Sequence, residues 1–241
     1  NSMIDKCKAS NLDALALTVD TITGGNRERD LKTGFTSPPK LTLKSLLSFI
    51  QKPKWTLNFL FRKKFDLPFL SDFIKEGTDI RISVSDYFTN MLDQNLNWKD
   101  AENIKKRWNG IFCLKGIMSR EDALKAVDIG ADAIMISNHG GRQLDGSRSP
   151  FDQLDEIVEA VGGKIDIICD GGIRRGTHIL KSLSKGATAC SGGRLYLYAL
   201  ASGGEKGVTK SISNLKEEVI RDMKLMGVTK ISELNKNNIR Y

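Results

Sequence analysis

Short apolar runs that end in polar, glycine-rich turns recur along this chain and alternate with stretches of helical periodicity. An apolar run of this length, bounded by turn residues, predicts a buried strand. We expect strands at residues 14–19, 110–114, 133–136, 165–169 and 187–191. Apolar positions at helical spacing, with caps and terminating glycines, predict helices at residues 98–108, 120–129, 150–161, 177–185 and 208–226.

Each expected strand ends in a turn that begins with a polar residue or a glycine. These exits are Asp20, Lys115, Ser137, Asp170 and Gly193. The last four lie 22, 33 and 23 residues apart, the span of successive βα units. Alternating βα units predict a parallel sheet, either doubly wound or closed into a barrel. Polar chemistry at the end of every strand favours the barrel. We therefore expect an α/β fold, a (β/α)8 TIM barrel that is incomplete here, with about five βα units and three further strands upstream of Asn1.

A long segment interrupts this alternation after the first expected strand, and we assign residues 36–97 to an insertion. Four apolar residues between Leu43 and Ile50 follow the i, i+3, i+4, i+7 spacing of a helix. Pro53 ends that helix, because proline is not tolerated in a helix interior. The last part of the insertion, residues 72–97, is polar, and we expect loop with short helical pieces there.

The net charge of +8 is concentrated in this insertion. Between Lys40 and Lys64 there are seven basic residues and no acidic one, and the rest of the chain has 30 basic against 29 acidic residues. Apolar and aromatic side chains interleaved with lysines are typical of a segment that lies on an anionic membrane surface. The alternative is a helical excursion packed on the domain or on a neighbouring subunit. The chain matches no known nucleic-acid-binding motif, so we expect no nucleic acid partner.

Length and cysteine content narrow the class further. A chain of 241 residues can bury the core of one domain, and we treat residues 1–241 as one. There is no run of 18 apolar residues and no signal peptide pattern, so we expect no membrane-spanning helix. The four cysteines have no metal-binding spacing, and we interpret them as thiols in a reducing compartment, with no metal site.

The most informative turn follows the third expected strand and holds His139 and Arg142. Histidine can exchange protons near neutral pH, and arginine binds carboxylates through a planar fork. The intervening Gly140 and Gly141 let the backbone turn tightly and approach a ligand. A base beside a carboxylate-binding group suits proton removal from a small carboxylic acid.

Two consecutive strand exits near the end combine glycines with arginines, at Gly171–Arg174 and Gly193–Arg194. Backbone amides at a helix start bind phosphate well when an arginine is nearby. TIM barrels usually carry a phosphate site after their last two strands. The sequence therefore predicts a phosphate site here.

Three motifs taken together carry a family resemblance. The run Ser137–Asp145 (SNHGGRQLD), the turn Asp170–Gly176 (DGGIRRG) and the pair Gly193–Arg194 resemble the FMN-dependent α-hydroxy acid dehydrogenases and oxidases. The pattern also matches, in order and spacing, at Leu17–Asp20, Asn26–Arg27 and Lys115–Gly116. Among members of that family, the chain looks most similar to the bacterial flavin L-lactate dehydrogenases. The stretch Pro38–Leu70 lies where mandelate dehydrogenase carries its membrane-binding segment.

The resemblance implies oxidation of an L-2-hydroxy acid, L-lactate in particular, to the 2-oxo acid, with FMN as cofactor. His139 would be the base that takes a proton from the substrate, and Asp20 would pair with it and stabilise its imidazolium. Arg142 would bind the substrate carboxylate, and Arg27 would assist. Lys115 would lie beside the flavin and stabilise negative charge on the reduced ring. The other implied cofactor contacts are Thr18, Ser137, Asp170, Gly171, Gly172, Arg174, Gly193 and Arg194.

The chain departs from the family at its start. The family's first three strands and its active-site tyrosines have no counterpart, so the five expected strands correspond to strands 4–8 of the barrel. Two other functions stay open. One is a catalytically inactive fragment, or a flavin- or phosphate-binding remnant of such an enzyme. The other is a different phosphate-binding barrel enzyme, against which His139 together with Arg142 argues.

The resemblance also implies partners. We expect a quinone or another electron acceptor to reoxidise the flavin, and a homo-oligomer, which is a tetramer in the family. We expect a cytoplasmic location, with peripheral attachment to the inner face of the cell membrane through Lys40–Lys64 as an option. His178 and Arg175 are expected at the surface, His178 without a role and Arg175 solvated or paired with a helix.

Overall fold

The computed structural model describes residues 2–28, 32, 42–61 and 92–240. The chain divides into two compact units, one formed by Asn1–Asn26 with Asp93–Tyr241 and the other by Arg27–Leu92. Most of the expected insertion, residues 36–97, lies outside the described residues, as does most of its last part, residues 72–97.

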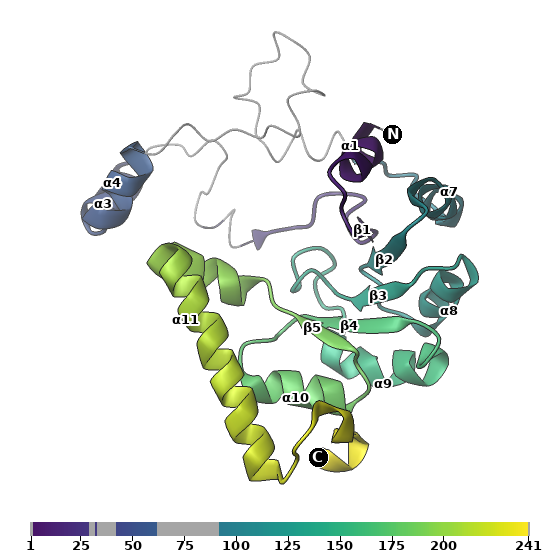
Figure 1. Ribbon diagram of the computed structural model, residues 1–241. Coiled ribbons are helices and arrows are strands. Elements are labelled where there is room, and N and C mark those ends of the chain that lie inside the picture. The colour runs from purple at the N-terminus through teal and green to yellow at the C-terminus, as the bar shows by residue number, and fades with distance from the viewer. Residues whose placement is uncertain (1, 29–31, 33–41, 62–91, 241) are drawn as a thin grey trace. The chain divides into compact units, whose positions relative to one another are not determined.

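The first unit is built on a parallel sheet whose strands follow one another in chain order (Figure 1). The strands are β1 (Ala14–Thr18), β2 (Ile111–Lys115), β3 (Ala133–Ile136), β4 (Asp166–Asp170) and β5 (Ala189–Ser191). The predicted parallel sheet of five strands is confirmed, but it is open, since β1 and β5 do not pair within the described residues. Four strands lie within one residue of the prediction at each end, and β5 begins two residues later than predicted.

Most of the helices of this unit lie along one face of the sheet, whereas the last one packs on the helix before it (Figure 1). The helices are α1 (Ser2–Ala9), α7 (Trp98–Trp108), α8 (Arg120–Asp128), α9 (Pro150–Val161), α10 (Gly176–Ser184) and α11 (Arg194–Met226), followed by the short 3-10 turns η1 (Ile231–Glu233) and η2 (Lys236–Asn238). Local capping explains where they begin. The side chains of Asn97, Ser119 and Ser149 each accept a hydrogen bond from a backbone N–H of the first helical turn.

The two faces of the sheet differ in what they contact. Phe112, Leu114, Ile134, Ile136 and Ile167 are at most 1% exposed and form one core cluster together with residues of α7, α8 and α9. The alternate residues of each strand point to the other face, because strand side chains alternate. That alternation leaves β1 half-exposed and gives β4 an alternating burial pattern. The expectation that each strand is buried throughout is therefore wrong for β1 and β4, and also for β5, which has no fully buried residue.

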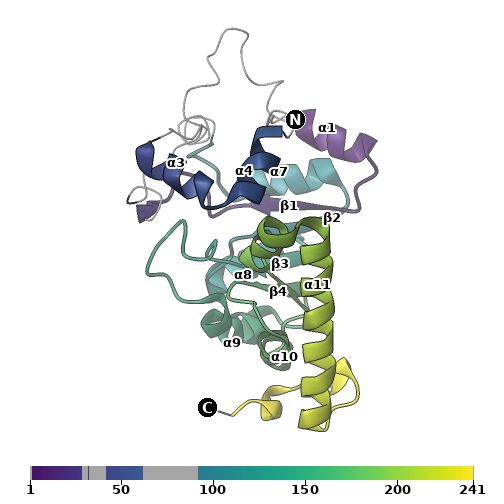
Figure 2. The same ribbon diagram turned by 90° about the vertical axis from the view of Figure 1, so that its left-hand side faces the viewer.

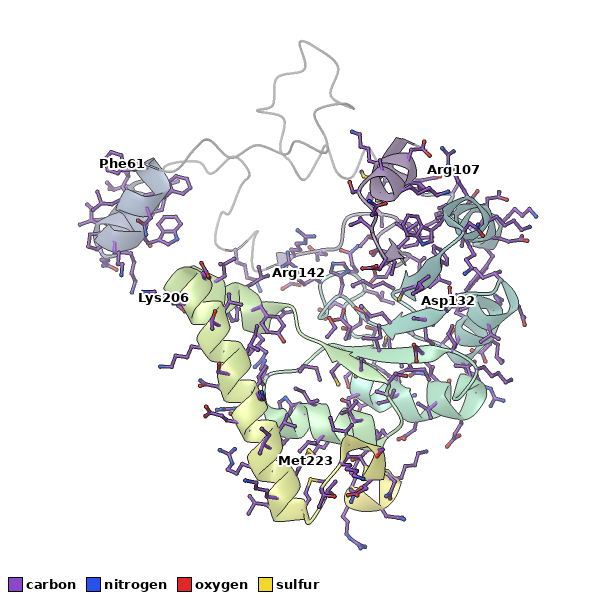
Figure 3. All side chains as sticks on the ribbon, in the orientation of Figure 1. Phe61, Arg107, Asp132, Arg142, Lys206 and Met223 are labelled. Carbon is purple, nitrogen blue, oxygen red and sulfur yellow. The ribbon has the colours of Figure 1, made fainter. Side chains whose placement is uncertain are left out.

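The last helical element is longer than predicted. The backbone of Gly204 is not helical, with a φ of 58° and a ψ of −146°, so α11 consists of two helices joined across a kink. The helix predicted at residues 208–226 lies within the second of them, and the first, which begins at Arg194, is not predicted. The second part of α11 packs on α10 through Leu180, Met223 and Val228 (Figures 2 and 3). The predicted pairing of Arg175 is confirmed, since its guanidinium contacts Glu218 of α11 at 2.8 Å.

The second unit contains a pair of helices, α3 (Leu43–Ile50) and α4 (Pro53–Phe61). The predicted helix and its break before Pro53 are confirmed. Phe49, Trp55 and Phe59 stack in sequence, with ring centroids 5.6 and 5.2 Å apart. The remaining large apolar side chains are exposed: Leu43, Leu46, Leu47, Ile50, Leu57, Leu60 and Phe61. Among the helices the structure describes, none is long and apolar enough to cross a membrane.

The buried cysteines give a first prediction. Burial raises the pKa of the Cys113 and Cys190 thiols to about 11 and also raises the pKa of Cys169. Near neutral pH these thiols therefore stay protonated, whereas alkylation requires the thiolate. At about pH 8 we expect iodoacetamide to modify the half-exposed Cys7 well before the other three, as followed by mass spectrometry of tryptic peptides. In concentrated urea all four should react at similar rates, and equal rates without urea would contradict the raised pKa values of the three thiols.

Candidate active site

The turn after β3 has an unusual backbone. His139, Gly140 and Gly141 have φ values of 56°, 67° and 71°, so three successive residues are left-handed. This conformation is costly for a residue with a side chain. The Asn138 side chain stabilises it, because its Oδ1 accepts hydrogen bonds from the N–H groups of Gly140 and Gly141 at 3.0 and 3.3 Å. The turn thereby holds the imidazole of His139 in one orientation.

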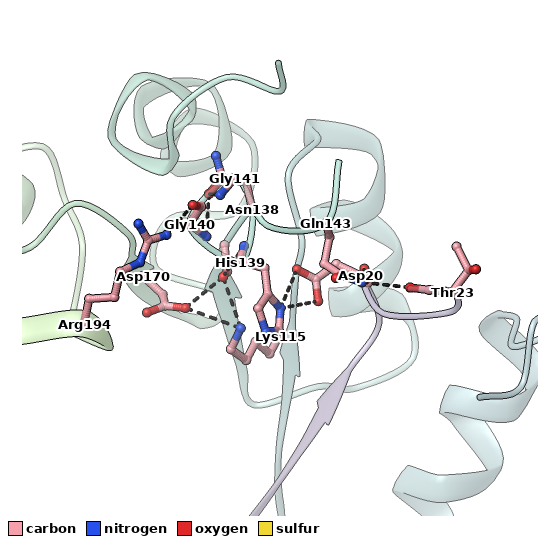
Figure 4. A network of polar contacts seen from close by, with 11 residues as sticks. Asp20, Thr23, Lys115, Asn138, His139, Gly140, Gly141, Gln143, Asp170 and Arg194 are labelled. Atoms are coloured by element: carbon pink, nitrogen blue, oxygen red, sulfur yellow. Dashed lines mark hydrogen bonds and ion pairs between the residues drawn. The ribbon is translucent and has the colours of Figure 1, made fainter. Parts of the chain in front are cut away.

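That imidazole contacts the carboxylate at the end of β1 (Figure 4). The Nδ1 atom of His139 lies 3.3 Å from both carboxylate oxygens of Asp20. The side chain of Asp20 is 14% exposed and that of His139 is 34% exposed. An ionised carboxylate only accepts hydrogen bonds, so the Nδ1 atom carries the hydrogen of this contact. The Nε2 atom of a neutral imidazole is then left as a base.

Glycine at position 116 allows Asp20 to lie where it does. Gly116 follows β2 with a φ of 108°. A Cβ atom at this position would lie 2.7 Å from the Cβ of Asp20 and 2.8 Å from its carboxyl carbon. The carboxylate therefore packs directly on the bare backbone of the neighbouring strand exit.

A second polar network lies beside this pair, at the ends of β2, β3 and β4 (Figure 4). The Nζ of Lys115 is 3.1 Å from the Oγ of Ser137 and 3.4 Å from Asp170. The Ser137 hydroxyl donates to the Asp170 carboxylate at 2.8 Å and accepts from the N–H of His139 at 3.2 Å. Ser137 is fully buried, and these bonds use all of its hydrogen-bonding capacity.

The glycine–arginine exits lie after β4 and β5. Gly171 and Gly172 have φ values of 155° and 73°, and a Cβ atom on Gly171 would contact Pro150. Gly193 precedes α11 without any side-chain cap on the first helical amides. The guanidinium of Arg194 donates to the carbonyl of Gly140, which joins the start of α11 to the His139 turn. Arg174 is exposed.

The remaining predicted residues are more peripheral. Thr18 is half-buried at the end of β1 and pairs in register with Lys115. Arg142 is exposed on the loop after β3 (Figure 3), and within the described residues its guanidinium makes no ion pair. Arg27 belongs to the second unit and is exposed. Among the described residues, no cluster of three or more His, Cys, Asp or Glu side chains could hold a metal ion.

The sequence did not predict the contacts of three residues. Gln143 donates from its side-chain amide to the backbone carbonyls of Asp20 and Thr23. Asn138 supports the left-handed turn, although it was singled out only as part of a motif. His178, for which the sequence predicts no functional role, makes a structural contact, because its Nδ1 accepts a hydrogen bond from the N–H of Arg174 at 3.2 Å. Asn138 and Gln143 both belong to the motif Ser137–Asp145, but the motif does not indicate their hydrogen-bond partners.

The fold is a parallel α/β sheet, and one edge of it carries an acid–base pair and glycine–arginine turns. These features define the class of enzymes that bind phosphate-bearing ligands at the C-terminal ends of parallel strands. Comparison with known proteins is more specific. The family model described as FMN-dependent dehydrogenase matches residues 1–241. The chain therefore belongs to the FMN-dependent dehydrogenase family, whose members are TIM barrels with FMN as cofactor.

Individual relatives agree with this assignment. The chain is 36% identical over 233 residues to the L-lactate dehydrogenase of Pseudomonas syringae pv. syringae. The match covers 96% of this chain and 61% of that protein. The crystal structure of the monotopic membrane protein (S)-mandelate dehydrogenase matches with a TM-score of 0.89 at 32% identity, over 99% of this chain and 63% of that one.

A soluble mutant of the membrane-associated (S)-mandelate dehydrogenase from Pseudomonas putida matches with a TM-score of 0.76 at 32% identity, over 99% of this chain and 60% of that one. The chain thus spans about 60% of the length of the relatives it matches.

The contact between Gly116 and Asp20 can be tested by substitution. Gly116→Ala adds a Cβ that collides with Asp20, whereas Gly130→Ala places one in open space. Both positions have a positive φ, of 108° at Gly116 and 75° at Gly130. Both pay for a left-handed backbone, about 1 kcal/mol. We expect Gly116→Ala to lower the free energy of unfolding by roughly 1–3 kcal/mol more than Gly130→Ala does, as measured by urea denaturation. Equal losses in the two variants would mean that Asp20 does not pack on Gly116.

Proposed function

We propose that this chain supplies the catalytic base and the cofactor-binding residues of an FMN-dependent enzyme that oxidises an L-2-hydroxy acid, L-lactate in particular, to the 2-oxo acid. The observation that carries the proposal is the Asp20–His139 pair beside the Lys115–Ser137–Asp170 network. Membership of the FMN-dependent dehydrogenase family and the L-lactate dehydrogenase among the relatives support it.

The proposed chemistry at His139 follows from its hydrogen bonding. The hydrogen on Nδ1 points to Asp20, so Nε2 is free to take a proton from the hydroxy acid. The imidazolium that forms is then stabilised by the adjacent carboxylate. We assign Arg142 to the substrate carboxylate, because a guanidinium holds a carboxylate through two parallel hydrogen bonds. Arg27 is proposed to assist it.

The donor set fits FMN at both ends of the molecule. A flavin gains negative charge when reduced, and the half-buried cation of Lys115 would stabilise it. Thr18, Ser137 and Asp170 would contact the ring and the ribityl chain. A dianionic phosphate suits the uncapped amides at the start of α11 together with arginine side chains. We assign it to Gly171, Gly172, Arg174, Gly193 and Arg194. When bound, FMN accepts the electrons that the hydroxy acid loses.

We also propose a place for this chain in the family's fold. The five strands correspond to strands 4–8 of the eight-stranded barrel, and residues 1–241 to the C-terminal part of a single domain with an insertion at residues 36–97. The open sheet and the chain's coverage of its relatives support this assignment.

The second unit is proposed to bind an anionic membrane surface from the cytoplasmic side. The exposed apolar side chains of α3 and α4, with the exposed Lys52 and Lys54, support this proposal. The presence of a monotopic membrane protein, (S)-mandelate dehydrogenase, among the similar structures also supports it. We further propose a quinone as electron acceptor and a homotetramer. Exposed apolar residues at the start of α11, such as Tyr198 and Leu200, support self-association.

The direct test of function is anaerobic mixing of the flavin-loaded protein with L-lactate. We expect the visible flavin absorption to bleach as the 2-oxo acid appears. A flavin-loaded protein that no 2-hydroxy acid bleaches would leave only a binding remnant, and would overturn the proposed reaction.

Replacement of His139 tests the assignment of the base. His139→Asn keeps a polar side chain of similar reach but cannot take up a proton near neutral pH. We expect turnover to fall on the order of a thousandfold, while the FMN affinity measured by flavin fluorescence stays within about twofold, since a base acts on the transition state rather than on cofactor binding. Parallel loss of turnover and FMN binding would assign His139 a structural role instead.

Charge substitution on α3 tests the membrane proposal. Leu47 and Ile50 are 55% and 72% exposed, so Leu47→Glu with Ile50→Glu removes apolar surface without disturbing a core. We expect sedimentation with phosphatidylglycerol vesicles to weaken at least tenfold, because each lost apolar insertion is worth more than 1 kcal/mol. The control is Leu225→Glu on α11, which is 81% exposed and should sediment like the unmodified protein. Equal sedimentation of all three proteins would exclude α3 as the contact.

A further inference from the structure

We infer that Gln143 is a positioning residue that holds the loop after β1, and with it the carboxylate of Asp20, against the imidazole of His139. The catalytic meaning of this inference rests on the proposed function, whereas the contact itself does not. Gln143 has had no role so far in the chemistry of the site, although it directly follows the arginine assigned to the substrate.

The sheet alone does not bring Asp20 and His139 together. They follow β1 and β3, which are not neighbours, because β2 lies between them. Strands separated by one strand are roughly 9–10 Å apart. The last ladder bond of β1 runs from the N–H of Val19 to the carbonyl of Lys115 at 2.8 Å. Beyond it, the chain that carries Asp20 must be held by contacts outside the ladder.

Gln143 supplies such a contact. Its Nε2 donates to the carbonyl of Asp20 at 3.2 Å and to the carbonyl of Thr23 at 2.9 Å (Figure 4). One side-chain amide has two hydrogens, and both are used on the same loop. A residue of the loop after β3 therefore forms hydrogen bonds to the loop after β1 at two points, and the bond to Thr23 spans 120 residues in sequence.

The backbones of the two loops also touch. A Cβ atom on Gly25 would lie 2.7 Å from the Cα of Gln143 and 2.9 Å from its Oε1 atom, and would overlap the carbonyl of Arg142. The loop after β1 thus packs directly on the segment Arg142–Gln143. On its other side, Asp20 packs on Gly116. Close packing on one side and a two-pronged amide on the other leave the carboxylate little freedom to move away from His139.

The chemistry explains why an amide is used here. Both acceptors are backbone carbonyls, so the residue at position 143 must donate twice. Glutamate has the same length but no hydrogen to donate, and it would bring a negative charge close to Asp20. Methionine has a similar shape and neither donates nor carries charge. Both substitutions should release the loop after β1.

The test is nuclear magnetic resonance of the full chain labelled with ¹⁵N-histidine. The chain contains only two histidines, so His139 and His178 give one set of imidazole signals each, and His178 reports on misfolding. Asp20→Asn defines the signal of a His139 imidazole without its carboxylate. We expect Gln143→Met and Gln143→Glu to shift the His139 Nδ1 signal in the same direction as Asp20→Asn does, and by at least half as much. The matched control is Leu144→Ala, a neighbour that is 74% exposed, which should leave the signal in place.

Turnover provides a second readout in a double-mutant comparison. As a single substitution, Gln143→Met should lower kcat roughly 10- to 100-fold. When Asp20 is already replaced by Asn, the same substitution should lower kcat less than about twofold, because the effects of residues that act through one contact are not additive. A purely structural role would give the same fold loss in both backgrounds and would overturn the inference. An unchanged His139 signal in Gln143→Met, while Asp20→Asn shifts it, would also overturn it. A protein without turnover whose His139 signal responds as expected would refute the proposed function and leave the role of Gln143 intact.

Discussion

The structure depends on one contact, the hydrogen bond between Asp20 and His139 across an intervening strand. It requires that the loops after β1 and β3 bend toward each other over the end of β2. Two backbone features make this possible: the bare Gly116, on which Asp20 packs, and the left-handed turn that starts at His139. A residue held in such a strained conformation persists only when its surroundings over-determine it. Here the surroundings are Asn138 and the carboxylate itself.

The pair is not isolated, because Ser137 links it to the charges on the neighbouring strands. The fully buried hydroxyl of Ser137 accepts from the N–H of His139 and donates to Asp170, which also faces the ammonium of Lys115. Residues from the ends of β1, β2, β3 and β4 thus form a continuous polar layer. Most of the helices pack on the opposite face of the strands, so the apolar core and this layer share the same strands without competing for the same side chains.

Much of this fold could be predicted because its signals are local. Ser119 and the Ser149–Pro150 pair mark helix starts through their own side chains, and the apolar runs mark the strands. The first helix of α11, before the non-helical Gly204, could not be predicted, because the glycine-rich segment that follows it obscures a helical pattern. The hydrogen bond from the Gln143 side chain to the carbonyl of Thr23 joins residues 120 positions apart, and no local sequence pattern predicts such a partner. The predicted site residues could be found by motif, whereas the left-handed backbone of His139 has no sequence signal.

The most direct test of the account is a crystal structure of the flavin-loaded protein with pyruvate bound. The account predicts that the Nε2 atom of His139 and the guanidinium of Arg142 both lie within hydrogen-bonding distance, about 3 Å, of the ligand, while Nδ1 remains on Asp20. Pyruvate bound at the flavin without contact to either side chain would contradict it.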